Sequence, residues 1–244
     1  MIDQGESLQP QEPKLSPEQI AKTDADIATL STISGHATSN GSILEVSGGY
    51  AIEAHFGGRI TRPHGDMDAV LWLSDASAQE TAREEITNIL FQEPTPWAEY
   101  PNVKNRQNFI EFREVAPEKQ FLDSRRLELY MFDRKGMRPL VEKVLTDSQG
   151  QEYKAMVTTI EEIVADKVRI LNRTGEEKKN KRATRQTDID EFKRIIGHKD
   201  FSKEKYLHAM AGSLVYRSGG NLTEEQALKI AEEQWNFAIQ QVNS

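Results

Sequence analysis

The chain has 244 residues, of which 37% are hydrophobic and 29% are charged, and its formal net charge is −8 at pH 7. Nonspecific DNA binding usually requires the opposite charge balance, because Lys and Arg must neutralise phosphates; small substrates or metal ions fit this chain better. The absence of cysteine excludes disulfides, zinc–thiolate sites and thiol catalysis.

No apolar run approaches the roughly 20 residues that a membrane-spanning helix needs. The segment 1–13 is polar and acidic and lacks the charged-then-apolar form of a signal peptide. We therefore expect a cytoplasmic, globular protein. Residues 1–15 carry no core pattern and are expected to form a flexible tail.

The first predicted elements mix helices with strands. Ser16-Pro17-Glu18-Gln19 is a helix-start signature, with a Ser cap and Pro at the first helical position. Ser77 opens a second capping box. In chain order we expect a helix from 16 to about Gly35, a strand over 43–46, a helix over 50–56, a buried strand over 66–73, a helix from 77 to about 91, and a loop over 94–101.

The pattern changes near residue 158. Alternating strands are expected over 109–112 and 127–132, with weaker ones over 140–145 and 153–157. Beyond them only helices are expected, over 159–171, 188–196, 202–216 and 223–242, with a basic loop over 178–185. The sequence therefore predicts an α/β (α+β) fold, in which a small mixed sheet with flanking helices (16–157) is followed by a C-terminal helical domain (158–244).

Two acids open the strand predicted over 66–73. Asp66 and Asp68 stand at i and i+2, so both would point to one face, about 6–7 Å apart along the strand. Their neighbours are apolar, and two like charges on a buried strand repel unless a cation lies between them. Oxygen ligands of this kind suit Mg²⁺. The alternative is a strand whose first residues simply emerge into solvent.

A glycine turn precedes these acids. Ser47-Gly48-Gly49 lies between a predicted strand and a predicted helix, where backbone N–H groups at the helix start attract phosphate and glycines let the backbone come close. The alternative for this segment taken alone is an ordinary tight turn. Between the turn and the acids, Arg62 is a candidate to balance triphosphate charge, and His64 to lie beside the metal or substrate. Their alternative is an ordinary loop.

Together these residues resemble a known signature. Gly48-Gly49-Tyr50-Ala51-Ile52-Glu53, then Gly57, then Thr61-Arg62-Pro63-His64-Gly65-Asp66-Met67-Asp68 looks like the motif of the polymerase-beta-type nucleotidyltransferase superfamily. It is most similar to the aminoglycoside and lincosamide branch, with Tyr50 in place of Trp and Glu53 in place of Asp. The resemblance implies an enzyme that binds a nucleoside triphosphate, with ATP favoured, and Mg²⁺ (or Mn²⁺). It would transfer the nucleoside monophosphate to an acceptor hydroxyl.

The resemblance also implies a third acid on a neighbouring strand. Glu128 is the preferred candidate, because relatives place this acid after an Arg-apolar prefix and Arg126-Leu127 provides one. Glu111 is the competitor. Either would otherwise be an outward-facing residue of a half-exposed strand.

A weaker resemblance extends into the helical part and keeps the acceptor open. Ala165 and Lys167, followed by Asp188, are similar to a pattern shared with the abortive-infection toxin nucleotidyltransferases, although Thr187 stands where a Lys is usual. Lys167 is therefore a candidate phosphate ligand. The acceptor would be a small antibiotic, or tRNA or protein if the basic segment 178–185 binds it. A non-catalytic nucleotide-binding relative is a further alternative.

Overall fold

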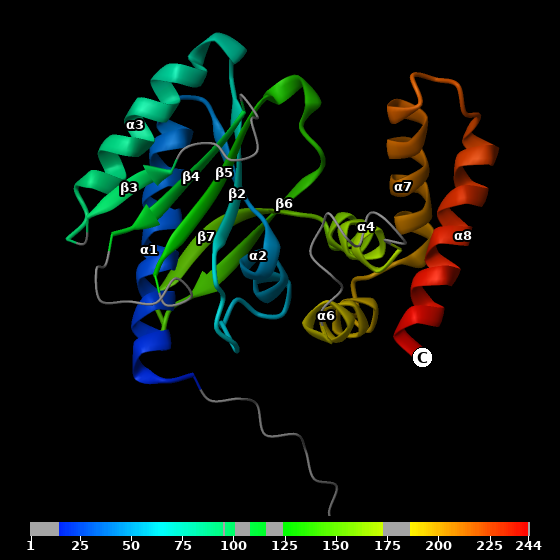
Figure 1. Ribbon diagram of the computed structural model, residues 1–244, viewed down its shortest axis with the longest axis horizontal. Coiled ribbons are helices and arrows are strands. Elements are labelled where there is room, and N and C mark those ends of the chain that lie inside the picture. Colours follow the sequence, from blue (N-terminus) through cyan, green and yellow to red (C-terminus); the bar gives the residue numbers. More distant parts are fainter. Residues whose placement is uncertain (1–14, 95, 101–107, 116–123, 173–185, 244) are drawn as a thin grey trace, which may run out of the picture. The chain divides into compact units, whose positions relative to one another are not determined.

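The computed structural model describes residues 15–94, 96–100, 108–115, 124–172 and 186–243 (Figure 1). Residues 1–14, nearly all of the expected tail, and the basic segment 178–185 lie outside the described residues. The chain divides into two compact units, Met1–Arg138 with Glu142–Val157, and Pro139–Val141 with Thr158–Ser244. No helix among the described residues is long and apolar enough to cross a membrane.

The first unit contains a seven-stranded sheet and the helices that flank it. Its elements are α1 (Pro17–Ser39), β1 (Ile43–Val46), α2 (Gly48–His55), β2 (Met67–Leu73), α3 (Gln79–Phe91), β3 (Trp97–Tyr100), β4 (Phe109–Glu114), β5 (Arg126–Asp133), β6 (Leu140–Thr146) and β7 (Glu152–Thr158), with two single 3₁₀ turns, η1 (Ala76–Ala78) and η2 (Arg134–Gly136).

The sheet is mixed, with the strand order β3-β4-β5-β2-β1-β7-β6. The central pair β1–β2 is antiparallel, whereas β2–β5 and β1–β7 are parallel. The outer pairs β3–β4 and β4–β5 are antiparallel. A mixed sheet with helices is the α/β class that the sequence predicted.

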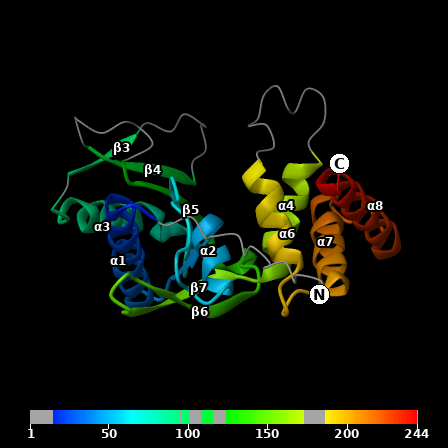
Figure 2. The same cartoon turned by 90° about the horizontal axis from the view of Figure 1, so that it is seen from below.

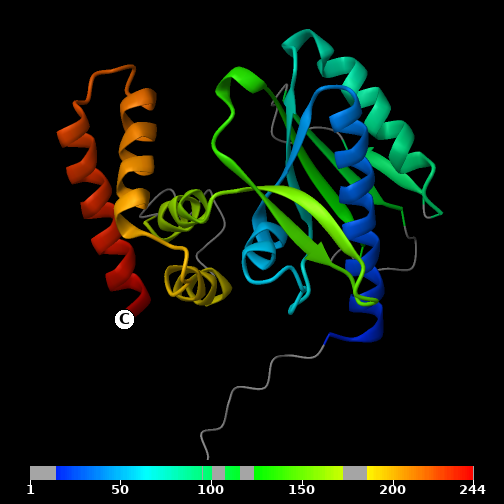
Figure 3. The same cartoon turned by 180° about the vertical axis from the view of Figure 1, so that it is seen from behind.

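The two faces of the sheet differ in chemistry. Successive side chains of a strand alternate between faces. On one face, Leu71 and Leu73 of β2 line a space shared with α1 and α3, which lie beside each other there (Figures 1 and 3). The buried Leu127 and Leu129 of β5 stand in register with Met67 and Ala69 of β2 and share this apolar face. Asp68 points to the opposite face, which is where the polar residues of β2 and β5 gather.

Three expected boundaries were wrong. The helix α1 passes Gly35 and ends at Ser39, with Asn40 as its C-terminal cap. Gly35 lies inside this helix, where a single glycine is tolerated at a cost of roughly 1 kcal/mol relative to alanine. The expected loop over 94–101 contains strand β3 at the sheet edge, where flanking prolines are tolerated. The helix expected from Ser77 begins at Gln79 without a side-chain cap, and the Asp75 side chain instead caps the turn η1 by accepting from the Ser77 N–H at 2.9 Å.

The second unit is helical, as the sequence predicted for this part of the chain. Its described helices are α4 (Ile160–Leu171), α6 (Gln186–Ile196), α7 (Lys203–Arg217) and α8 (Glu224–Asn243), which pack as a group (Figure 2). Trp235 of α8 forms the centre of their core, with ring centroids 5.8 Å from Phe192, 5.7 Å from Phe201 and 5.1 Å from Tyr206.

Candidate functional site

The glycine turn lies directly against the strand that carries the acids. Gly48 has a φ of +59°, and a Cβ there would overlap Oδ2 of Asp68. A Cβ on Gly49 would overlap Nδ1 of His64. The Ser47 N–H donates to the main-chain carbonyl of Asp68 at 2.8 Å. Only glycine fits both positions, so the turn places the start of α2 beside Asp68 and His64.

The start of α2 has no side-chain cap from the residue before it. The Ser47 side chain makes no capping hydrogen bond to the helix, and its hydroxyl donates instead to Oε1 of Glu45 at 3.2 Å. The first N–H groups of a helix have no partner within the helix and favour anions. This end of α2, next to Asp68, is therefore suited to a phosphate group.

Asp68 and Glu128 are neighbours across two parallel strands. Their Cα atoms are register partners between β2 and β5, so they point to the same face at the strand spacing of about 4.8 Å. Glu111 is the register partner of Glu128 on β4, which places it roughly twice that distance from Asp68. The geometry therefore groups Asp68 with Glu128 more closely than with Glu111.

Asp66 lies just before β2 rather than within it. The strand begins at Met67, one residue later than the sequence predicted. The carboxylate of Asp66 forms an ion pair with the guanidinium of Arg126, whose Nη2 also lies 3.3 Å from Oε1 of Glu128. Burial opposes the charge of Arg126, but the carboxylates of Asp66, Glu128 and Glu111 hold its pKa above its ordinary value.

The carboxylates do not form a finished metal cage in this structure. Within the described ranges, no group of three or more His, Asp or Glu residues is spaced to hold a metal ion. The position of Arg126 gives the physical reason, because its cation already binds Asp66 and lies near Glu128. The donor atoms are all carboxylate oxygens, which is the ligand type that Mg²⁺ prefers.

The loop before β2 is held from two sides. Arg62, expected to bind triphosphate, lies with its Nε 3.7 Å from Oε1 of the fully buried Glu53, and Thr61 donates to the other oxygen of Glu53 at 3.2 Å. His64 is buried, with its ring centroid 4.8 Å from that of Tyr50. Both residues lie in the loop that leads to Asp66.

A buried polar network behind this loop was not predicted from the sequence. Oδ2 of Asp26, on α1, accepts from the Tyr50 hydroxyl at 2.8 Å and from Lys22 at 3.0 Å. Lys22 also donates to the carbonyl oxygen of His64 at 2.9 Å. Burial, together with the charge of Asp26, raises the pKa of Tyr50 well above its ordinary value. The network thus connects α1 to both the glycine-turn helix and the acid loop.

Arg125 completes this network. Its Nε donates to Oδ1 of Asp26 at 2.8 Å, and Nη1 to Oε2 of Glu93 at 2.5 Å. Its guanidinium carbon also lies 5.0 Å from the centre of the Trp97 ring. In the sequence, the network could be suspected only from Asp26, an acid next to the apolar Ile27 in a predicted helix. Its partner Arg125 stands 99 residues further along the chain, so no local pattern connects the two.

A second buried acid lies beneath the glycine turn. Glu45 on β1 is fully buried and accepts from the indole N–H of Trp72 at 2.8 Å and from Nε of Arg138 at 2.9 Å. The sequence showed it only as a polar residue within a predicted strand. Because Ser47 also donates to Glu45, this acid ties the turn to the sheet.

Lys167 lies in the other unit, on α4. Its ammonium forms an ion pair with Asp188 at 3.2 Å and another with Glu191, both on α6. These contacts join the two helices that carry the weaker sequence resemblance. Arg173, which belongs to the same weaker sequence resemblance, lies outside the described residues.

The sequence matches no protein-family profile and no curated protein. Solved structures do match. The antibiotic-resistance factor ANT(2'')-Ia is 14% identical with a TM-score of 0.50, covering 82% of this chain and 95% of that one. JHP933 from Helicobacter pylori is 14% identical with a TM-score of 0.43, covering 93% and 95%. The Cid1 poly(U) polymerase is 15% identical with a TM-score of 0.31, covering 50% and 35%. The likeness to the first of these shows that the chain shares the fold of that antibiotic-resistance factor.

Proposed function

We propose that this protein is a metal-dependent nucleotidyltransferase that moves a nucleoside monophosphate from a nucleoside triphosphate, with ATP favoured, to an acceptor hydroxyl. One observation carries the proposal. The start of α2 at Gly48, which the Ser47 side chain does not cap, is packed against the carboxylate of Asp68, and Glu128 stands in register with Asp68 on the next strand. A phosphate-binding helix start and a pair of carboxylates thus meet at one point.

The residues present suit a bound Mg²⁺ or Mn²⁺ in their chemistry. Asp66, Asp68 and Glu128 offer carboxylate oxygens, and Asp66 would exchange the cation of Arg126 for the metal. When bound, the divalent ion would neutralise triphosphate charge and lower the pKa of the acceptor hydroxyl. Glu128 would act as a ligand or accept the hydroxyl proton, while Ser47, Gly48 and Gly49 would hold the β- and γ-phosphates.

The proposed acceptor is a small hydroxylated antibiotic such as an aminoglycoside or a lincosamide. The polar face of the sheet supports an acceptor with positive charge, because Asp66, Asp68, Glu111 and Glu128 all lie there. Unlike charges across a site favour association. The antibiotic-resistance factor with the same fold makes these compounds the first acceptors to test.

The first test is transfer of labelled nucleotide. The protein, Mg²⁺ and labelled ATP, CTP, GTP or UTP would be incubated with aminoglycosides, lincosamides or tRNA, and label on the acceptor and pyrophosphate release would be measured. We expect label on a drug with the wild type and none with the Asp66→Asn/Asp68→Asn double variant. The exposed Asp200→Asn is the matched control and should transfer normally.

The outcomes separate the parts of the proposal. A double variant as fast as the wild type would refute the carboxylate site. Label on tRNA but never on a drug would refute the antibiotic acceptor while leaving nucleotidyl transfer in place. Nucleotide binding by calorimetry without pyrophosphate release, under every acceptor, would instead indicate a nucleotide-binding protein without catalysis.

The identity of the third acid has its own matched pair. Glu128→Gln and Glu111→Gln make the same change on adjacent strands of one face. We expect Glu128→Gln to lower kcat about 10²–10⁴-fold, the range for losing a proton-transfer group. Glu111→Gln should have a far smaller effect, because Glu111 is one strand further from Asp68 and pairs with Nε of Arg113 at 2.6 Å. The reverse order would make Glu111 the third acid.

A further inference from the structure

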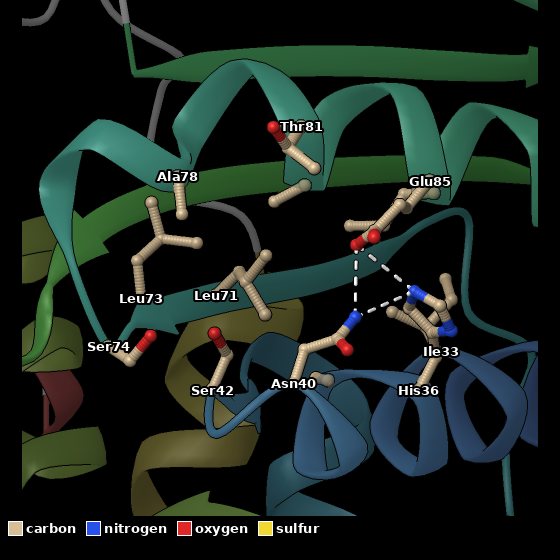
Figure 4. Close-up of a pocket in the computed structure, with 13 residues that line it drawn as sticks. Ile33, His36, Asn40, Ser42, Leu71, Leu73, Ser74, Ala78, Thr81 and Glu85 are labelled. Atoms are coloured by element: carbon tan, nitrogen blue, oxygen red, sulfur yellow. Dashed lines mark hydrogen bonds and ion pairs between the residues drawn. The ribbon is translucent and has the colours of Figure 1, made fainter.

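A cavity lies on the apolar face of the sheet, away from the candidate site. It has a volume of about 250 Å³ and lies between α1 and α3, over the end of β2 (Figure 4). Its floor is formed by Leu71 and Leu73, whose side chains point away from the face that carries Asp68. A ligand here would therefore be separate from the nucleotide site.

Small side chains leave this space open. Ala37 on α1 and both Ala78 and Ala82 on the α3 side line the cavity. A well-packed interface between two helices normally fills such a volume with larger apolar side chains. An engineered cavity of about 150 Å³ holds a benzene molecule, so this cavity has room for one aromatic ring and a short chain.

One end of the cavity is polar and organised. Oε2 of Glu85 lies 3.1 Å from Nε2 of His36 and 3.0 Å from Nδ2 of Asn40, which itself lies 3.0 Å from the His36 ring nitrogen (Figure 4). Two side chains from the end of α1 thus converge on one carboxylate oxygen of α3. The side chains of His36 and Glu85 are 39% and 36% exposed, so a ligand can reach them from solvent.

The charge at this end favours a cation. His36 and Asn40 belong to the last turn and cap of α1, and the C-terminal end of a helix carries partial negative charge. The Glu85 carboxylate adds a full negative charge a few ångströms away. A protonated amine would bond to Glu85 in place of the imidazole and the amide.

Hydroxyl groups line the rest of the wall. Ser42, Ser74 and Thr81 border the cavity (Figure 4). Within the part of the chain that the structure describes, their side-chain oxygens have no hydrogen-bond partner. A pocket with apolar walls and a few placed polar groups is the usual form of a small-molecule site.

We propose that this cavity is a binding site for a small primary amine with an apolar body about the size of a phenyl ring. The body lies on Leu71 and Leu73 between the alanines, and the ammonium group bonds to Glu85. This site does not depend on nucleotidyl transfer, because it is formed entirely by α1, α3 and residues at the end of β2 and before β1.

The test compares three probes of one size on the full chain. Phenethylamine is cationic, 2-phenylethanol neutral and phenylacetate anionic. By calorimetry we expect phenethylamine to bind with a Kd on the order of 1 mM, as is reasonable for so few atoms. The alcohol should bind about tenfold more weakly, because it lacks the charge-assisted bond, and phenylacetate should not bind detectably.

Two variants and one control locate the binding. Ala82→Leu should fill the cavity and abolish binding of both the amine and the alcohol, whereas Ala28→Leu, at an exposed position of α1, should bind both normally. Glu85→Gln should reduce the affinity for phenethylamine about tenfold, to that of the alcohol, and leave the alcohol unchanged.

Several results would overturn the proposal. It fails if phenethylamine does not bind, if phenylacetate binds as well as the amine, or if Glu85→Gln leaves the preference for the amine intact. Circular dichroism would check that Ala82→Leu folds. If it does not fold, the Glu85→Gln result still decides. None of these outcomes bears on nucleotide transfer, which is measured separately.

Discussion

Two adjacent arginines, Arg125 and Arg126, form ion pairs in two different regions of the first unit. Arg125 points to the helical side of the sheet and pairs with Asp26, and the two side chains are 8% and 0% exposed. Arg126 points to the polar face and pairs with Asp66, and these side chains are 24% and 34% exposed. Two neighbouring residues at the start of β5 therefore form ion pairs on opposite faces of the sheet.

The surroundings of each pair differ as much as their exposure. Asp26 accepts from Arg125, Lys22 and Tyr50, so its charge is fully surrounded by donors. Burial opposes the charge of Arg125, yet the carboxylates of Asp26 and Glu93 hold its pKa above the ordinary value. A buried pair of this kind is costly to separate. A partly exposed pair exchanges partners cheaply, which would suit the metal-binding role proposed above for Asp66.

The largest expected effect follows from breaking the buried pair. Arg125→Met keeps much of the side-chain volume but leaves Asp26 without its main cation, and we expect a loss of about 3–5 kcal/mol in the free energy of unfolding. Urea denaturation followed by circular dichroism measures this loss.

The matched control is the same substitution one residue later. Arg126→Met should lose less than about 1 kcal/mol, as expected for a partly exposed pair. Equal losses of stability in the two variants would show that burial does not distinguish these arginines. A loss below about 1 kcal/mol in Arg125→Met would contradict the structural role of the buried network.

A smaller effect is expected at the edge of the same network. Tyr50→Phe removes one hydrogen bond to the charged Asp26 and keeps the ring that packs against His64. The loss should be about 1.5–3 kcal/mol, the range for a hydrogen bond to a charged group. Urea denaturation again provides the measurement, with Tyr153→Phe, whose hydroxyl bonds to Asp147 at 3.2 Å near the surface, as control. A smaller loss in Tyr50→Phe than in the control would contradict this ranking.

The features that could be predicted from the sequence are those that short motifs and local hydrophobic periodicity determine. Glycine is required at Gly48 and Gly49 because each packs against a side chain of the Thr61–Asp68 segment, and spacing within one short motif was enough to group them. The helical second part was also predictable, because 3.6-residue periodicity extends over each of its helices. The mixed sheet followed from alternating segments such as β5.

The remainder depends on contacts between distant segments. No periodicity connects Asp26 with Arg125, because their pairing arises only when β5 lies beside β2 and under α1. The same holds for the ion pair between Asp66 and Arg126, which are 60 residues apart in the chain. Strand β3 was missed because prolines flank it, and an edge strand tolerates them.

The smallest expected effect concerns the partly exposed ion pair between Arg126 and Asp66. If Arg126 competes with a divalent ion for Asp66, then Arg126→Met should tighten Mn²⁺ binding, because a positive charge beside the site is removed. The gain should be about two- to fivefold, since a partly exposed pair contributes at most about 1 kcal/mol. Paramagnetic resonance titration of Mn²⁺ without nucleotide measures it, and Arg83→Met, which breaks an exposed pair with Glu99 far from Asp66, is the control. Unchanged or weaker Mn²⁺ binding in Arg126→Met would mean that Arg126 orients Asp66 for the metal rather than competing with it.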